Sequence, residues 1–278
     1  MTPGASNPRS SGANTQGQYA TINGLRMYYE VHGEGRPLVL LHGGYQVIEA
    51  LEPLLSSLAR HWQVIAPELE GHGRTADLDR PLTREQMAED VAGLLDHLGV
   101  TEADVVGYSL GGMAAMRLAM RRPDLVRKLV LVSAPYSNDG YYPSTMAGWP
   151  DMSAEGFVGT PMEQVYMRAA PHPEHWPIFV EKVKHALMDF PGWSADDIRG
   201  ITAPTLLILG DADLVRPEYA VEMFRLFGGA RADGGMGGVP ASQLAILPGV
   251  THFSILSRLD LLLPIVTPFL DAPTSDTE

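Results

Sequence analysis

Short runs rich in apolar residues alternate with amphipathic segments along most of the chain. The apolar runs cover residues 37–41, 62–66, 104–108, 128–133, 205–209 and 243–247. Runs of this kind are typical of strands that are buried on both faces. The segments between them carry apolar residues at helical spacing, which predicts helices. Strands that alternate with helices in this way indicate an α/β protein with a mostly parallel, doubly wound sheet.

Turn and cap residues refine this prediction. Two β-rich segments between residues 19 and 31 flank Asn23-Gly24, a pair that favours a type I′ turn, so a β-hairpin is expected there. Thr83 is a suitable N-cap for a helix that Gly99 ends. The helices of the predicted core are expected at about residues 47–60, 83–98, 110–121, 217–227 and 253–270.

The pattern changes between residues 134 and 201, where prolines and aromatic residues are dense. No strand is expected in this stretch, and helices are predicted near residues 163–170 and 177–188. A segment of this kind between two core strands is a candidate inserted cap. We therefore expect a disordered N-terminal tail, a first core part, a helical cap, a second core part and a C-terminal tail, at residues 1–18, 19–135, 136–200, 201–272 and 273–278.

Composition narrows the classes of function. The chain has 278 residues, 45% of them hydrophobic, and a formal net charge of −13. This length fits one large α/β domain with an insertion, and the acidity argues against nucleic acid or an anionic membrane as the partner. The absence of cysteine excludes disulfides, thiolate catalysis and cysteine-ligated metals. The chain shows no secretory signal and no membrane-spanning run, so we expect a soluble, cytoplasmic protein.

A Gly-x-Ser-x-Gly motif lies at the end of one predicted strand, at residues 107–111. A helix-forming segment follows, so Ser109 is expected on a sharp turn between strand and helix. At Gly107 and Gly111 we expect other chain segments to pass so closely that a side chain would not fit, which explains glycine at both positions. A serine presented in this way is a candidate nucleophile. It needs a base within hydrogen-bond reach and a carboxylic acid that hydrogen-bonds to the base and orients it.

Histidine is the usual base because its pKa lies near neutrality, and nine histidines compete for this role. His252 follows the last predicted strand, and Asp213 follows the strand before it. Both are therefore expected at the sheet edge where Ser109 lies. Asp211 is a near alternative for the acid, and Asp139, shortly after an earlier strand, is a more remote one.

This order of serine, aspartate and histidine resembles the α/β-hydrolase fold family. The resemblance covers about residues 19–270 and rests on His42-Gly43-Gly44, Gly71-His72-Gly73-Arg74, Gly107-Tyr108-Ser109-Leu110-Gly111-Gly112, Gly210-Asp211-Ala212-Asp213 and Gly249-Val250-Thr251-His252-Phe253. It implies an eight-stranded, mostly parallel sheet with an inserted helical cap. It also implies Ser109 as nucleophile, His252 as base and Asp213 as acid, with no metal and no cofactor.

The resemblance further implies an oxyanion hole made of backbone N–H groups. Leu110, directly after the serine, is expected to supply one group, and Gly44 or alternatively Tyr45 the other. His42 and His72 are then expected to stabilise their loops instead of transferring protons. The residues at His42-Gly43-Gly44-Tyr45 form what we call the His-Gly loop. The substrate pocket is expected to be lined by residues from this loop, from the turn that carries Ser109 and from the cap, namely Tyr45, Tyr108, Met113, Trp149 and Trp176.

Other polar and glycine-rich features have simpler interpretations. His172 and His175 lie in the cap without metal-ligand partners in the sequence pattern, so no metal site is expected. The glycine-rich loop at 228–240 lacks the ending of a P-loop and is expected to be a connector. Surface or core positions are expected for the remaining histidines, His32, His61, His97 and His185.

The expected function is that of a serine hydrolase, most simply a carboxylesterase for small to medium hydrophobic esters. Hydrolysis of a C–C bond in a dienoic ring-cleavage product and cofactor-free perhydrolysis are alternatives with the same triad. A receptor for a small ligand, with slow residual hydrolysis, is an alternative from another class. Epoxide hydrolases and dehalogenases are disfavoured, because in the resemblance they have an aspartate where this chain has Ser109. Amide and lactone hydrolysis stay open.

Overall fold

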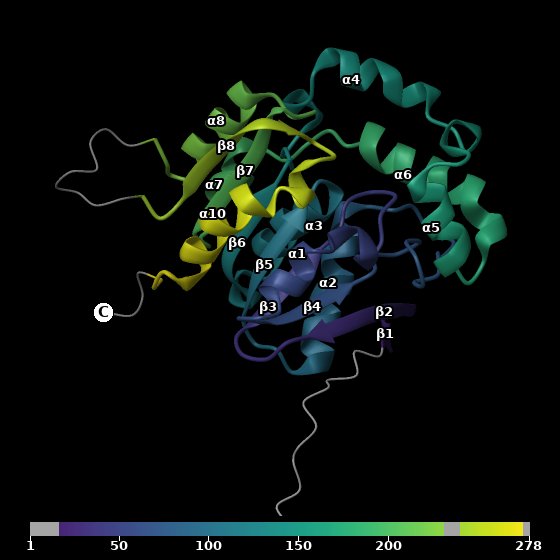
Figure 1. The fold of residues 1–278 in the computed structure, drawn as a ribbon, viewed down its shortest axis with the longest axis horizontal. Coiled ribbons are helices and arrows are strands. Elements are labelled where there is room, and N and C mark those ends of the chain that lie inside the picture. The colour runs from purple at the N-terminus through teal and green to yellow at the C-terminus, as the bar shows by residue number, and fades with distance from the viewer. Residues whose placement is uncertain (1–16, 231–239, 275–278) are drawn as a thin grey trace, which may run out of the picture.

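Eight strands form a single sheet in the computed structural model (Figure 1). They are β1 Gln18–Ile22, β2 Leu25–His32, β3 Pro37–Leu41, β4 Gln63–Pro67, β5 Ala103–Tyr108, β6 Val126–Val132, β7 Thr205–Ala212 and β8 Gln243–Thr251. Their order across the sheet is β1-β2-β4-β3-β5-β6-β7-β8. Strands β3 to β8 pair in parallel, while β1 pairs antiparallel with β2, and β2 antiparallel with β4. The predicted eight-stranded, mostly parallel sheet is confirmed.

The structure describes residues 17–230 and 240–274. The predicted N-terminal tail lies outside these residues except for its last two positions. Most of the glycine-rich loop at 228–240 and the end of the C-terminal tail lie outside them as well. Within the described ranges, no helix is long and apolar enough to cross a membrane.

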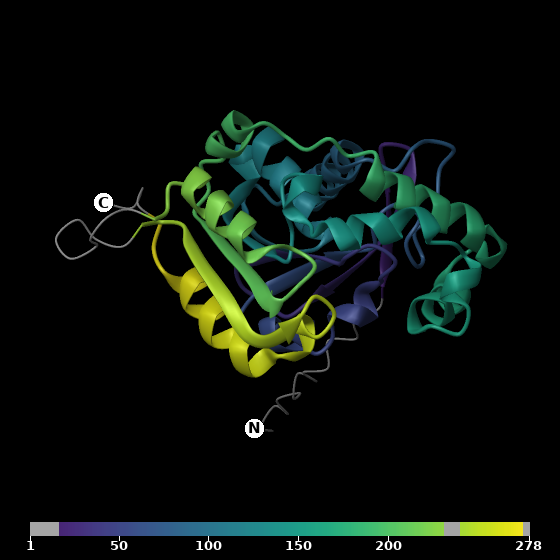
Figure 2. The ribbon, with the colours of Figure 1, turned by 90° about the horizontal axis from the view of Figure 1, so that it is seen from above.

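Each face of the sheet carries its own hydrophobic core, since successive strand residues point to opposite faces. Val39 and Leu41 of β3 belong to the core that also contains residues of α2 (Arg84–Leu98), α3 (Leu110–Arg121) and α8 (Pro217–Leu226). Leu38 and Leu40 belong to the core formed with α1 (Leu54–Leu58) and α10 (Leu259–Asp271). Figure 2 shows α10, in yellow, on one side of the sheet and α8, in green, on the other. Burial on both faces explains the continuous apolar runs.

Local signals in the sequence are confirmed at the hairpin turn and at both ends of α2. Asn23 and Gly24 have φ values of 51° and 83°, as the predicted hairpin turn between β1 and β2 requires. The Thr83 side chain accepts a hydrogen bond from the Gln86 N–H at 3.1 Å and caps α2. Gly99 ends that helix with a φ of 70°.

Some predicted element bounds are wrong. The helix expected at 47–60 is split into a 3-10 turn, Ile48–Leu51, and the short α1, because Pro53 interrupts the helical hydrogen-bond pattern between them. Strand β8 continues beyond its predicted end at residue 247, through Pro248 and Gly249, to Thr251, which pairs with Ala212 of β7. That pairing extends both strands beyond their apolar runs.

The chain between β6 and β7, which we call the helical insert, contains α4 (Pro143–Gly148), α5 (Pro161–Ala169), α6 (Trp176–Met188) and α7 (Ala195–Arg199). The helices predicted near 163–170 and 177–188 correspond to α5 and α6. The short α4 and α7 were not predicted. Figure 1 shows α4, α5 and α6 as a group of teal and green helices that project beyond the sheet.

Candidate active site

Ser109 occupies the turn between β5 and α3. Its φ is 52° and its ψ is −119°, a strained conformation for a residue with a side chain. The close approach expected around it is confirmed. A Cβ atom on Gly107 would lie 2.5 Å from the carbonyl oxygen of Gly111, and one on Gly111 would overlap with the carbonyl oxygen of His42. The two glycines therefore allow the turn that presents the serine hydroxyl.

Gly111→Ala is expected to lower the free energy of unfolding by about 1–3 kcal/mol, because the new methyl group displaces backbone. Urea denaturation measures this change. Gly148→Ala in α4 is the matched control, since that glycine has a φ of −84° and open space around it. It is expected to change stability by less than about 1 kcal/mol. Equal effects of the two substitutions would refute the steric role of Gly111.

The structure brings His252 and Asp213 to Ser109, as predicted. His252 follows β8, and Asp213 follows β7. The Ser109 hydroxyl lies 3.2 Å from Nε2 of His252, and Nδ1 of the same ring lies 2.8 Å from Oδ1 of Asp213. His252 and Asp213 are both 5% exposed. Three strand ends thus supply a continuous hydrogen-bonded chain from a hydroxyl through an imidazole to a carboxylate.

The Asp213 carboxylate is held from several sides. Oδ2 accepts a hydrogen bond from the Ser133 hydroxyl at 2.5 Å and one from the Gly210 N–H at 3.2 Å, and Oδ1 accepts the Val215 N–H at 3.1 Å. Burial alone would raise the pKa of Asp213. The hydrogen bonds from His252, Ser133 and Val215, with the charge of His252, lower it below the usual value. The carboxylate therefore stays ionised and fixed in orientation behind the histidine.

Ser133 is a site residue that the sequence analysis missed. It directly follows β6, beside β7, with a φ of 55° and 1% exposure. Its place at the carboxyl edge of the sheet is the one signal that could have identified it. Another missed contact joins the Tyr108 hydroxyl to the backbone carbonyl of His252 at 2.8 Å. Both contacts position a member of the hydrogen-bonded chain.

The two alternative acids lie elsewhere. Asp211 accepts the N–H groups of Gly249 at 2.8 Å and Val250 at 3.3 Å, which closes the end of β8. Asp211 therefore stabilises this end of the strand pair. Asp139 lies in a 3-10 turn, where its backbone carbonyl accepts a hydrogen bond from Arg216 at 2.6 Å. Within the described residues, neither carboxylate hydrogen-bonds to His252.

The backbone groups expected to form the oxyanion hole lie close together. A Cβ atom on Gly44 would lie 3.6 Å from the Leu110 side chain, so the His-Gly loop packs against the start of α3. Tyr45 follows with a φ of 60°. Across residues 17–230 and 240–274, no hydrogen bond occupies the N–H of Gly44, Tyr45 or Leu110. These donors are available to a bound oxyanion.

His42 and His72 are buried side by side beneath this loop, with ring centroids 4.9 Å apart. Nδ1–H of His42 donates to the Gly43 carbonyl at 2.8 Å, and Nε2 accepts the Leu69 N–H at 3.1 Å. Nδ1–H of His72 donates to the Glu70 carbonyl at 2.9 Å. Burial lowers the pKa of His42 to about 4 and that of His72 to about 3. Both rings are neutral at pH 7 and stabilise their loops, as predicted.

The free energy of unfolding is expected to fall in acid partly through His72. An unfolded histidine titrates near pH 6.5, whereas burial lowers the folded pKa of His72 to about 3. Between these values the unfolded state binds one more proton, so stability is full above pH 6.5 and is lost below it by about 1.4 kcal/mol per pH unit. His72→Gln is expected to reduce the slope of unfolding free energy against pH by this amount, measured with urea between pH 6.5 and pH 5.

The control for this measurement is His97→Gln, which changes an exposed histidine at the end of α2. The slope of unfolding free energy against pH is expected to be the same in this variant as in the wild-type chain. A slope that His72→Gln does not change would contradict the assignment of His72 as a buried neutral group.

The residues predicted to line the substrate pocket take part in several separate packing contacts. Tyr108 packs in the core on the α1 and α10 side of the sheet. Met113, one turn after Ser109, is fully buried and accepts a hydrogen bond from Arg84 on its sulfur at 3.4 Å. The Tyr45 hydroxyl donates to the Val180 carbonyl of α6 at 3.2 Å. These positions reflect packing between distant elements, which periodicity does not reveal.

The two predicted tryptophans belong to separate aromatic contacts in the helical insert. Trp149 packs against Tyr141 at 4.9 Å between ring centroids, and Trp176 packs against Tyr166 at 5.0 Å. A cavity of about 760 Å³ lies elsewhere, between residues 79–85 at the start of α2 and residues 182–193 at the end of α6. None of the five predicted pocket residues lines this cavity.

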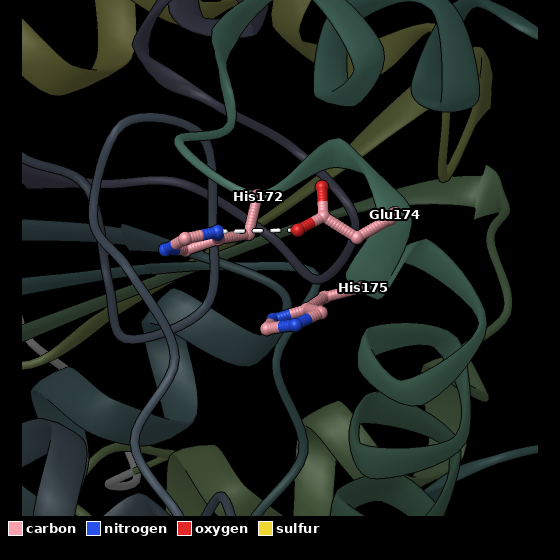
Figure 3. Close-up of side chains that lie close together, drawn as sticks. All are labelled: His172, Glu174 and His175. Atoms are coloured by element: carbon pink, nitrogen blue, oxygen red, sulfur yellow. Dashed lines mark hydrogen bonds and ion pairs between the residues drawn. The ribbon is translucent and has the colours of Figure 1, made fainter.

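The expectation that His172 and His175 lack ligand partners is wrong in one respect. Glu174 lies with them, and one ligand atom from each of the three residues falls within 4.8 Å of the others (Figure 3). Oε1 of Glu174 is 3.2 Å from Nδ1 of His172. The two imidazole rings are nearly parallel, at 24°, with centroids 5.0 Å apart.

Histidine and glutamate are suitable ligands for a transition metal, but the ligand atoms of these three residues are spread over distances of up to 4.8 Å. Ligands bound to one tetrahedral zinc ion lie about 3.3 Å apart, since each is about 2 Å from the metal. Nearly parallel rings do not direct their nitrogen lone pairs at a common point. The absence of a metal site stays a prediction.

Comparisons with known proteins agree with the fold. Residues 36–161 match a family model described as alpha/beta hydrolase fold. A protein from Azorhizobium caulinodans assigned as the carbamate hydrolase RutD is 28% identical over 234 residues, which cover 72% of this chain and 82% of that protein. A soluble epoxide hydrolase from Corynebacterium sp. strain C12 is 40% identical over 116 residues, 41% of this chain and 40% of that protein.

A solved structure extends the likeness to nearly the whole chain. The enol-lactonase from Burkholderia xenovorans LB400 superposes with a TM-score of 0.69 and 23% identity, over 92% of this chain and 100% of that one. Together with the sheet order, these matches show that the chain has the α/β-hydrolase fold. The names of the three similar proteins all denote hydrolases, which supports hydrolysis as the general class of reaction.

Proposed function

We propose that this chain is a serine hydrolase that cleaves carboxylic esters through an acyl-enzyme on Ser109. The observation that carries the proposal is the hydrogen-bonded chain from Ser109 through His252 to Asp213, with distances of 3.2 Å and 2.8 Å. A serine hydroxyl is a weak nucleophile unless a base accepts its proton in the transition state. Here Nε2 of His252 is placed to do so.

In the first half of the reaction, Oγ of Ser109 attacks the ester carbonyl carbon while Nε2 of His252 takes the hydroxyl proton. Asp213 holds Nδ1–H of His252 and stabilises the imidazolium that forms. The N–H groups of Leu110 and Gly44 donate to the carbonyl oxygen as it becomes an oxyanion, each contributing about 3 kcal/mol. His252 then gives its proton to the leaving alcohol, and the acyl group remains on Ser109.

In the second half, His252 removes a proton from a water molecule that attacks the acyl carbon. The tetrahedral intermediate collapses, the carboxylic acid leaves, and the proton returns from His252 to Oγ of Ser109. The proposed steps use only groups of the protein, the substrate and water. No cofactor is included in the proposal.

The proposed substrate is a small or medium hydrophobic ester, and the helical insert is proposed to be its cap. Aromatic rings from the insert meet the His-Gly loop, which carries one proposed oxyanion donor. The Tyr45 ring lies 4.9 Å from that of Phe157 and 5.9 Å from that of Phe179. An apolar, aromatic surface next to the nucleophile favours an apolar acyl or alcohol group.

Epoxide hydrolysis is not proposed, despite the similarity to a soluble epoxide hydrolase. In the family resemblance, enzymes of that kind have an aspartate at the nucleophile position, and this chain has Ser109. The similarity to that protein covers 41% of this chain.

A substrate panel tests the proposed bond specificity. Purified chain is assayed with matched p-nitrophenyl butyrate, butyranilide, γ-butyrolactone and a dienoic ring-cleavage ketone, and kcat/KM is compared. The ester is expected to exceed the amide and the ketone by at least about 100-fold, because an alkoxide or phenoxide leaves more readily than an amine or a carbanion. A higher kcat/KM for the ketone or the lactone would overturn ester specificity. One stoichiometric burst without turnover would favour the ligand receptor.

A further inference from the structure

Arg84, the first residue of α2, carries a buried guanidinium group without a carboxylate partner. The residue is 3% exposed. Its Nη1 donates to the Ala186 carbonyl, and Nη2 donates to the Met113 sulfur at 3.4 Å. Its Nε is buried with no hydrogen-bond partner among the described residues. A charged side chain is almost never buried in this way unless an anion pairs with it, because desolvation is costly.

The other cations around Arg84 already have partners. Nε of Arg80 donates to Glu70 at 2.7 Å, and Lys182 forms an ion pair with Asp77 at 2.6 Å. In the described part of the chain, no carboxylate lies within ion-pair distance of the Arg84 guanidinium. Burial lowers the pKa of Arg84 to about 10, so the group is still charged at neutral pH. Arg84 therefore has no ion-pair partner among the described residues, and Glu85 acts on its charge only from beyond ion-pair distance.

Arg84 lines the cavity of about 760 Å³ between the start of α2 and the end of α6, which we call the Arg84 cavity. Its volume is in the range of small-molecule sites, about 300–1,000 Å³. The Phe190 ring lies 4.0 Å from the guanidinium carbon, and Leu82 and Trp193 add apolar walls. Asp79, Glu85 and Asp189 line the cavity as well, as do the paired cations Arg80 and Lys182. The cavity thus combines apolar walls with charged groups of both signs, and Arg84 is the lining cation that has no carboxylate partner among the described residues.

We propose that the Arg84 cavity binds an organic carboxylate with a small apolar body, whose carboxylate group pairs with Arg84. A guanidinium presents parallel N–H groups that match the two oxygens of a carboxylate. The unpartnered Nε, which is buried in this structure, can donate to one oxygen once the Arg84 side chain turns toward the cavity. Nη2 can donate to the other by leaving the Met113 sulfur, which is a weak acceptor. The apolar body then packs against Phe190 and Trp193.

The proposed site is distinct from the hydrogen-bonded chain of Ser109 but close to it. None of Ser109, Asp213 and His252 lines the Arg84 cavity. Met113, which contacts Arg84, donates its N–H to the Ser109 carbonyl at 3.1 Å. Such a carboxylate has two possible sources, the acid product of the proposed ester hydrolysis or a separate small acid. The binding itself does not depend on the proposed function.

Calorimetry with phenylacetate and its neutral isostere phenylacetamide tests the proposal in the full chain. Wild type is expected to bind phenylacetate at least about 10-fold more tightly than phenylacetamide. Arg84→Gln is expected to abolish this preference. Lys182→Gln, at a paired cation of the same cavity, is the matched control and is expected to keep it. Equal affinity for the two probes, or a preference that Arg84→Gln retains, would overturn the proposal.

A second measurement needs no substitution in the cavity. In wild type, the Nε–H resonance of Arg84 is expected to shift on titration with phenylacetate and not with phenylacetamide, and no shift would overturn the proposal. Ser109→Ala is expected to bind phenylacetate as wild type does, which separates this site from the proposed catalysis. Competitive inhibition of ester turnover by phenylacetate would identify the product acid as the source, and noncompetitive inhibition a separate acid.

Discussion

Ser109→Ala is expected to lower kcat for p-nitrophenyl butyrate by about 10⁴-fold or more. The substitution removes the atom that is placed to attack the ester carbonyl, while His252 and Asp213 keep their mutual contact at 2.8 Å. What remains is the slow reaction of water near the oxyanion donors. Steady-state release of p-nitrophenolate measures the loss.

Thermal unfolding provides the control for Ser109→Ala. The hydroxyl makes its 3.2 Å contact with His252 at a partly buried position, so its loss is expected to move the unfolding midpoint by a few degrees at most. A folded variant with the wild-type rate would refute Ser109 as the nucleophile.

Asp213→Asn is expected to lower kcat by about 10³- to 10⁴-fold, because an amide no longer holds His252 in the productive tautomer. The same change at Asp211 is the matched control. Asp211 belongs to the same β7–β8 edge, but its carboxylate accepts backbone N–H groups of Gly249 and Val250 and does not contact His252. Asp211→Asn is expected to change kcat by less than about 10-fold.

Kinetics of the two variants under the same conditions distinguish the candidate acids. If Asp211→Asn, or Asp139→Asn, lost activity as severely while Asp213→Asn retained it, the acid would be misassigned. Retention of the wild-type unfolding midpoint shows that each loss is chemical.

The strand positions could be predicted because central parallel strands are buried on both faces. Leu38 and Val39 are adjacent in the sequence but lie in different cores, and a run of such residues is legible without a structure. The ends of β7 and β8 are harder to predict from the sequence. Thr251 belongs to β8 because it pairs with Ala212, and a pairing between distant segments leaves no local signal.

The nucleophile turn could be predicted because steric demands restrict its residues. Gly107 and Gly111 meet backbone atoms that leave no room for a Cβ. Those contacts recur wherever a serine is presented between a strand and a helix, so the motif carries structural information.

The surroundings of the site could not be predicted in the same way. Ser133 supports Asp213 through one side-chain hydrogen bond, and a serine after a strand has no special signature. The Arg84 cavity forms between the start of α2 and the end of α6, which are about 100 residues apart in the chain. Tertiary packing alone creates such a space, and sequence periodicity describes each helix separately.

The pairing of Thr251 with Ala212 has a consequence for how the molecule is assembled. Asp213 and His252 each follow directly after one member of that pair, so registration of two neighbouring strands is enough to place their side chains 2.8 Å apart. Ser109 reaches its own position more than a hundred residues earlier, in β5 and α3. As the chain emerges from the ribosome, the nucleophile turn can form long before its base exists. Any activity that needs both would begin only when β8 pairs with β7, which makes it a reporter of that late pairing.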